Sequence, residues 1–163
     1  MQNKNIFGFD VEWNYKAMIM FALLLGLPNL LGMINISMQG FKIHFFQIAI
    51  FIAAFIYGPV GGMMSGMLGS VYSAVMMSNP YIVLFNMILG FFTGMFFRFG
   101  MKSIFAVWLA FLVELPVLIV LDHFVVGMPT KVLINLVIAL AISNTAWAIV
   151  SHYSVRWIQK QIS

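Results

Sequence analysis

The chain has 163 residues, of which 63% are hydrophobic and only 7% are charged, and its formal net charge is +4. Soluble domains carry about 25% charged residues, so a soluble fold of this length could not cover its surface with so few charges. Lipid is therefore the solvent expected around it, and six spanning helices of about 20 residues each would leave no room for a soluble catalytic or nucleotide-binding domain.

Long apolar stretches separated by short turns follow one another along the chain. They lack the alternation of barrel strands, and open sheets cannot span lipid, so each is predicted to be a helix. Turns are marked at Gly58-Pro59, Ser78-Asn79-Pro80 and Gly127-Met128-Pro129, because the residue before a proline is disfavoured in a helix. The sequence predicts one membrane domain over 1–163, an all-α bundle of six transmembrane helices at 17–34, 43–57, 60–77, 81–99, 104–126 and 131–157.

Basic residues are divided unequally between the two ends of this predicted bundle. With six spans, both termini lie on one side of the membrane, and the opposite side carries only Lys42 and Lys131. Positive charge favours the cytoplasmic side, so both termini are expected in the cytoplasm and the protein in the plasma membrane. These charges are read as topology signals, and no nucleic-acid partner is expected. The basic residues on the terminal side are Lys4, Lys16, Arg98, Lys102, Arg156 and Lys160.

Several polar residues lie within the predicted spans or at their outer ends. Glu114 is near the middle of the fifth span, and a carboxylate at that depth is costly when charged, so it is expected to face the interior or to be protonated. It is a substrate ligand, a proton site, or an acid bonded to a neighbouring helix. Asp122 lies nearer the outer surface, as a ligand or a solvated helix end. Asn86 and Asn135 need buried partners, which a neighbouring helix or a substrate can supply.

The third predicted helix carries small residues at every fourth position. This spacing lets two helix backbones approach closely in lipid, either inside the bundle or against another membrane subunit. Gly90 and Gly94 repeat the spacing on the fourth helix, where internal packing is expected. The small residues of the third helix are Gly58, Gly62, Gly66, Ser70 and Ala74.

Signals for catalysis, cofactors or metals are missing. The sequence contains no HExxH motif, no Walker A motif and no cysteine, so no enzyme, cofactor or metal site is expected.

Glycine and proline motifs cluster between Phe51 and Gly94. They are Phe55-Ile56-Tyr57-Gly58-Pro59-Val60-Gly61-Gly62, then Gly66 and Gly69, Asn79-Pro80-Tyr81, and Leu89-Gly90 with Gly94. This pattern resembles the substrate-binding (S) components of energy-coupling factor (ECF) transporters, in which a Gly-Pro-x-x-Gly turn opens the third helix and Leu-Gly-x-x-x-Gly lies in the fourth.

The resemblance implies a component that captures a vitamin-like micronutrient on the outer side, under a lid formed by the first outer connection. It also implies a transmembrane coupling subunit and two cytoplasmic ATPases as partners. It places His44, Asn79, Tyr81 and Asn135 near the pocket. The residues predicted to dock the coupling subunit are Gly58, Pro59, Gly62, Gly66 and Ser70.

Residues and resemblance together favour a substrate-binding component of an ATP-driven importer. Two alternatives stay open: a non-transporting six-helix scaffold subunit, and an autonomous carrier that uses Glu114 as a proton site. The complete set of predicted substrate-binding residues is His44, Asn79, Tyr81, Asn86, Glu114, Asp122 and Asn135.

Overall fold

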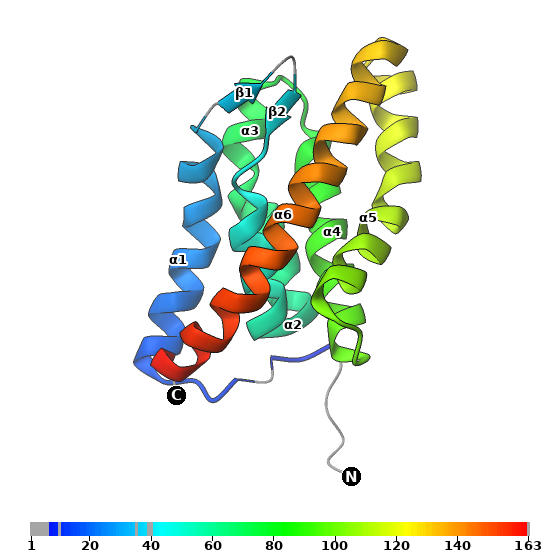
Figure 1. Ribbon diagram of the computed structural model, residues 1–163. Coiled ribbons are helices and arrows are strands. Elements are labelled where there is room, and N and C mark those ends of the chain that lie inside the picture. Colours follow the sequence, from blue (N-terminus) through cyan, green and yellow to red (C-terminus); the bar gives the residue numbers. More distant parts are fainter. Residues whose placement is uncertain (1–6, 10, 35, 39–40, 163) are drawn as a thin grey trace.

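The computed structural model describes residues 7–9, 11–34, 36–38 and 41–162 of the chain, without the side chains of 36–38 and 41–43. Long helices stand side by side, with a short antiparallel hairpin at one end of the bundle (Figure 1). In chain order the elements are α1 (Tyr15–Gly32), β1 (Ile36–Met38), β2 (Phe41–Ile43), α2 (Gln47–Gly69), α3 (Val71–Met76), α4 (Tyr81–Arg98), α5 (Ser103–Val120), the π-helix η1 (Leu121–Val125) and α6 (Thr130–Ile162).

Five helical stretches in the described chain are long and apolar enough to cross a membrane. The prediction of an α-helical membrane protein is confirmed at this level. The predicted second and third helices count here as the single stretch Gln47–Met76, which joins α2 and α3. The hairpin of β1 and β2 was not predicted, and it lies in the connection between α1 and α2, which the sequence predicts to be the first outer connection. The lid that the resemblance implies falls on residues 35–43, whose side chains lie outside the described part.

The helix α2 reverses direction at Gly58. This residue has φ 76° and ψ −162°, a non-helical conformation that glycine adopts readily, and Pro59 follows it. A Cβ atom built at Gly62 would lie 2.8 Å from the Cβ of Ala54. Residues eight apart on a continuous helix are separated by about 12 Å along its axis. The two halves of α2 are therefore antiparallel, and the turn predicted at Gly58-Pro59 is where the chain folds back.

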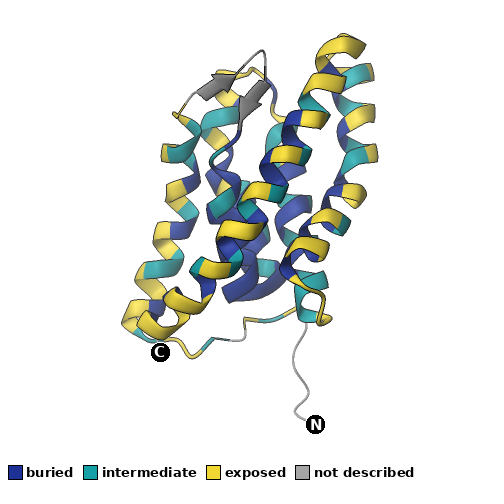
Figure 2. Ribbon diagram, viewed as in Figure 1, coloured by how far each residue is buried: buried dark blue, intermediate teal, exposed yellow. Residues whose placement is uncertain are grey.

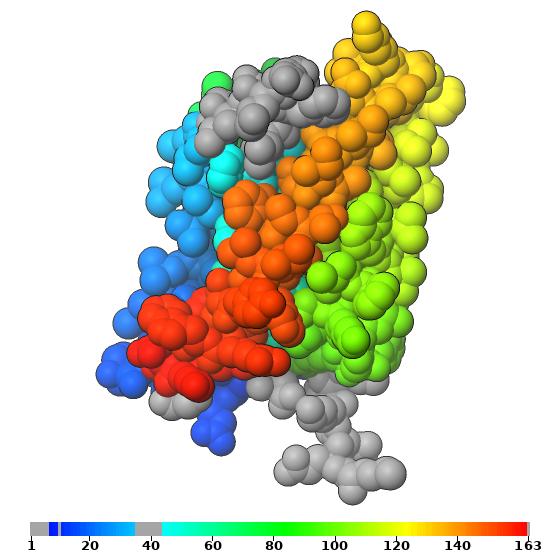
Figure 3. All heavy atoms as spheres, in the orientation of Figure 1, coloured from blue at the N-terminus to red at the C-terminus, as the bar shows by residue number. Residues whose placement is uncertain are grey.

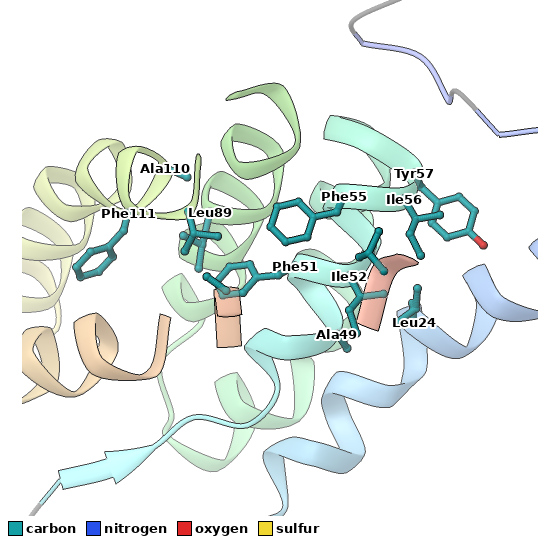
Figure 4. Close-up of a cluster of buried hydrophobic side chains, with 14 of the residues drawn as sticks. Leu24, Ala49, Phe51, Ile52, Phe55, Ile56, Tyr57, Leu89, Ala110 and Phe111 are labelled. Carbon is teal, nitrogen blue, oxygen red and sulfur yellow. The ribbon is translucent and has the colours of Figure 1, made fainter. Parts of the chain in front are cut away.

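The first half of α2 forms the centre of the bundle. It is apolar all round, as expected of a helix without a solvent-facing side, and Phe51 and Tyr57 on it are fully buried. Figure 4 shows its side chains among Leu24 of α1, Leu89 of α4 and Phe111 of α5. In the space-filling view α6 runs obliquely across the front, and little of α2 is visible behind it (Figure 3).

The exposed residues of the long helices are largely apolar and lie on their outward faces. Exposed positions alternate with buried ones along α1, α5 and α6 (Figure 2). On α1, for example, Ile19 and Leu23 are exposed whereas Leu24 is buried. Such apolar outer surfaces are what a bundle surrounded by lipid requires.

The structure corrects the predicted docking face, because that row of small residues packs inside the chain against α4. A side chain at Gly62 would collide with the backbone carbonyl of Gly90, and one at Gly66 would collide with the carbonyl of Asn86. The close backbone approach expected of small residues in lipid is thus used internally. All five predicted docking residues are buried: Gly58, Pro59, Gly62, Gly66 and Ser70.

Contacts at one end of the bundle join the beginning and the end of the described chain. The Asn14 side-chain amide donates to the carbonyl of Ile162 over 2.6 Å. Arg98 at the end of α4 donates to the carbonyl of Gly8. We call this the terminal end of the bundle. The hairpin of β1 and β2 lies at the opposite end (Figure 1).

Tyr57→Phe is expected to lower stability by about 1 kcal/mol, because it removes one buried hydrogen bond. The Tyr57 hydroxyl donates to the carbonyl of Ala17 over 2.7 Å, and its ring packs on Trp13 and Phe21. Thermal unfolding in detergent should show a midpoint lowered by about 2–4 °C. Tyr153→Phe is the matched control, since Tyr153 is exposed. Equal midpoints for the two variants would show that the Tyr57 bond contributes nothing.

Candidate functional site

A cavity of about 50 Å³ lies at the end of the bundle opposite the termini. Side chains from the start of α2 and from α3, α4, α5, η1 and α6 surround it. One water molecule needs about 10–15 Å³ of such space, so the cavity has room for a few waters or a small chemical group. A neighbouring cleft of about 130 Å³ shares His44, Phe46, Ser73 and Met77 with it. The two spaces together are large enough to consider a small ligand.

Five of the seven predicted substrate-binding residues line this one cavity: His44, Asn79, Asn86, Glu114 and Asp122. They come from four separate parts of the chain, and the fold brings them to a common space.

The other two predicted residues do not line the cavity. Asn135 lies on an exposed face of α6. Tyr81 is half-buried at the start of α4, where its backbone N–H donates to the Asn79 side-chain oxygen over 3.1 Å. Its side chain packs against the hydrophobic core and does not line the cavity.

Two carboxyl groups from one continuous helical run face the cavity. Asp122 is 1% exposed and lies in η1, and Asn79 donates to its Oδ1 over 2.7 Å. Glu114 is 3% exposed and lies in α5, two residues before Pro116. Among the described residues its Oε2 atom has no hydrogen-bond partner. Because buried polar atoms are nearly always paired, this oxygen marks a place where a ligand group or a water belongs.

The backbone of His44 is fixed to α6 by two hydrogen bonds. Its N–H donates to the Ser143 hydroxyl over 3.3 Å, and its carbonyl accepts from the Trp147 indole over 2.8 Å. The His44 side chain is buried and lines both the cavity and the neighbouring cleft. The residue thus forms a fixed wall between the two spaces. Sequence reasoning found His44 but gave Ser143 and Trp147 no part in the site.

The apolar walls of the cavity include Phe46, Phe85, Leu118 and Leu140. In sequence these residues are indistinguishable from those of the bundle core, so no signal could have assigned them to the site. Within the described chain no group of three or more His, Asp or Glu residues is placed to hold a metal ion. The chemistry that this arrangement offers is hydrogen bonding and charge pairing to a partly apolar molecule.

No family model, curated protein or solved structure matches this chain. The fold and the cavity define a helical membrane protein with a small, carboxyl-lined chamber at one end.

Proposed function

We propose that this protein is the substrate-binding component of an ATP-driven micronutrient importer in the plasma membrane, and that it captures its solute in the carboxyl-lined cavity together with the neighbouring cleft. The observation that carries the proposal is Glu114: a carboxyl inside a predicted membrane span, lining a cavity, with one oxygen that has no partner among the described residues. Intramembrane ionisable residues are costly and usually mark a substrate or ion path.

The proposed topology has six membrane crossings, with both termini in the cytoplasm and the cavity towards the outside. The reversal at Gly58 supports it, because the chain before Gly58 and the chain after it then run in opposite directions. Lys16, Lys102 and Lys160 lie at or near the terminal end, whereas Lys131 lies at the cavity end. This distribution follows the positive-inside rule.

The energy source is proposed to lie in partner proteins, a transmembrane coupling subunit and two cytoplasmic ATPases. The resemblance of the segment around Gly58-Pro59 and Leu89-Gly90 to S components supports these partners, and the sequence has no Walker A motif of its own. Because the small residues of α2 are packed against α4, a coupling subunit would have to contact a different surface.

Filling the cavity tests the proposal. Leu136 lines the cavity from α6, and Leu136→Trp is expected to occupy the space that the solute needs. Native mass spectrometry of the purified protein should show a bound small molecule that is lost from this variant. Ile138→Trp is the matched control, because Ile138 is exposed on the same helix. A wild-type protein free of any small molecule, with no ATPase subunit co-purifying, would contradict the proposal and favour a scaffold.

The proton-coupled carrier rests on the same Glu114 carboxyl, and it makes an opposite prediction for the isolated protein. A carrier reconstituted alone in liposomes takes up its solute when a pH gradient is applied, and Glu114→Gln abolishes that uptake. A substrate-binding component takes up nothing under those conditions, because the ATPases are missing.

A further inference from the structure

The ionisable side chains that line the cavity are mainly acidic. Among the described residues its lining contains two carboxyl groups, Glu114 and Asp122, and no lysine or arginine. Lys131 is exposed at the beginning of α6 and does not line the cavity, and the side chain of Lys42, two residues before His44, lies outside the described part. His44 is the only other lining residue able to carry a charge. The described part of the site therefore offers hydrogen-bond acceptors and two carboxyl groups, and a cation bound beside a carboxyl group favours its charged form.

The two carboxyl groups differ in whether a neighbouring side chain already donates a hydrogen bond to them. Asp122 already accepts a hydrogen bond from Asn79. Glu114 is 3% exposed, and its Oε2 atom has no donor among the residues described. A carboxylate buried in an apolar surrounding is stable only when it is paired with a cation or with several N–H donors. Glu114 is thus the group that a ligand must satisfy.

The remaining walls define the rest of the ligand. Phe46, Phe85, Leu118 and Leu140 present apolar surface close to the Glu114 carboxyl. His44, Glu114 and Asp122 all line the cavity, but among the described residues they are not placed as a group that could hold a metal ion, which argues against a bare metal ion as cargo. An organic molecule with a charged nitrogen and a compact apolar body matches both halves of the lining.

We propose, on the basis of the proposed function, that the solute is a small organic cation, such as a protonated amine or amidine attached to a compact apolar group. Its N–H groups donate to the Glu114 carboxylate, and its apolar part lies against Phe85 and Leu118. Asp122, held by Asn79, supplies a second acceptor on the same side of the cavity.

Three probes of similar size and different charge test this assignment: benzylamine, benzyl alcohol and benzoate. Isothermal titration of the purified protein in detergent should show binding in the order benzylamine, then benzyl alcohol, with no binding of benzoate. Glu114→Gln should weaken benzylamine binding about 10- to 100-fold, the range of one charge-assisted hydrogen bond, and should leave benzyl alcohol unchanged. Glu12→Gln is the matched control, because Glu12 is exposed near the terminal end.

The outcomes separate the substrate class from the function. If benzoate or benzyl alcohol binds as tightly as benzylamine, or if the co-purified molecule is an anion, the cationic class is wrong while the binding component stands. If no probe binds and no small molecule co-purifies, the proposed function fails with it. If Glu114→Gln does not fold, Asp122→Asn is the second variant. The assignment would be overturned if Asp122→Asn bound benzylamine as tightly as the wild type and the wild type showed no preference for benzylamine over benzyl alcohol.

Discussion

Gly62→Ala is expected to destabilise the bundle by about 1–3 kcal/mol, the usual range for added volume in a packed interior. A Cβ atom at Gly62 would collide with the carbonyl group of Gly90 and would crowd Ala54. The first contact joins α2 to α4, and the second joins the two halves of α2. Backbone atoms cannot move aside as a flexible side chain can, so the helices must separate along their shared length.

Gly26→Ala is the control, because the same substitution there has the opposite expected effect. Gly26 is in α1, and nothing lies within 4 Å of a Cβ atom built on it. Alanine in a helix is up to about 1 kcal/mol more favourable than glycine, so the variant should be neutral or slightly more stable. Thermal unfolding followed by size-exclusion chromatography compares the two variants. If Gly62→Ala melts no earlier than Gly26→Ala, the close contact between α2 and α4 is wrong.

Much of the fold could be predicted from the sequence because lipid restricts the choice. Apolar runs of sufficient length must be helical, and proline and glycine mark their ends. The reversal at Gly58-Pro59 was predicted as a turn between two helices for this reason. The end of α6 was predicted at 157, but the helix continues to Ile162. Its last residues are polar, so a prediction based on apolar runs ends the helix before them.

The direction in which the glycine row faces could not be predicted. Gly62 and Gly66 have the same spacing whether the partner helix belongs to this chain or to another one. Only the structure shows Gly90 and Asn86 of α4 occupying that face. The resemblance implied that these residues lie at a coupling surface, whereas in the structure they pack against α4 inside the chain.

The polar part of the site was predictable because polar groups inside a membrane are expensive and therefore conspicuous. Glu114 was found on that ground. Asn135 shows what the sequence could not predict, because its position along the chain did not indicate the side of α6 on which it lies, and that side is exposed. The apolar walls carry no signal in a chain that is 63% hydrophobic.

Membrane topology is expected to give an all-or-none result with single cysteine variants, since the chain contains no cysteine of its own. Glu12, Lys102, Lys131 and Lys160 are exposed positions suited to this substitution. In intact cells a membrane-impermeant maleimide should label Lys131→Cys and none of the other three. In inverted vesicles the pattern should be reversed.

The comparison of Lys160→Cys with Glu12→Cys decides how α2 crosses the membrane. If Gln47–Met76 crossed once, the chain would have five crossings, and Lys160 would lie across the membrane from Glu12. If the chain folds back at Gly58, the number of crossings is even and the two positions are labelled together. The hydrogen bond between Asn14 and Ile162 joins the ends of α1 and α6 directly, and a bond of that length cannot form across a bilayer about 30 Å thick. Labelling of Lys160→Cys from the side opposite to Glu12→Cys would therefore overturn both the reversal at Gly58 and the packing of the two termini.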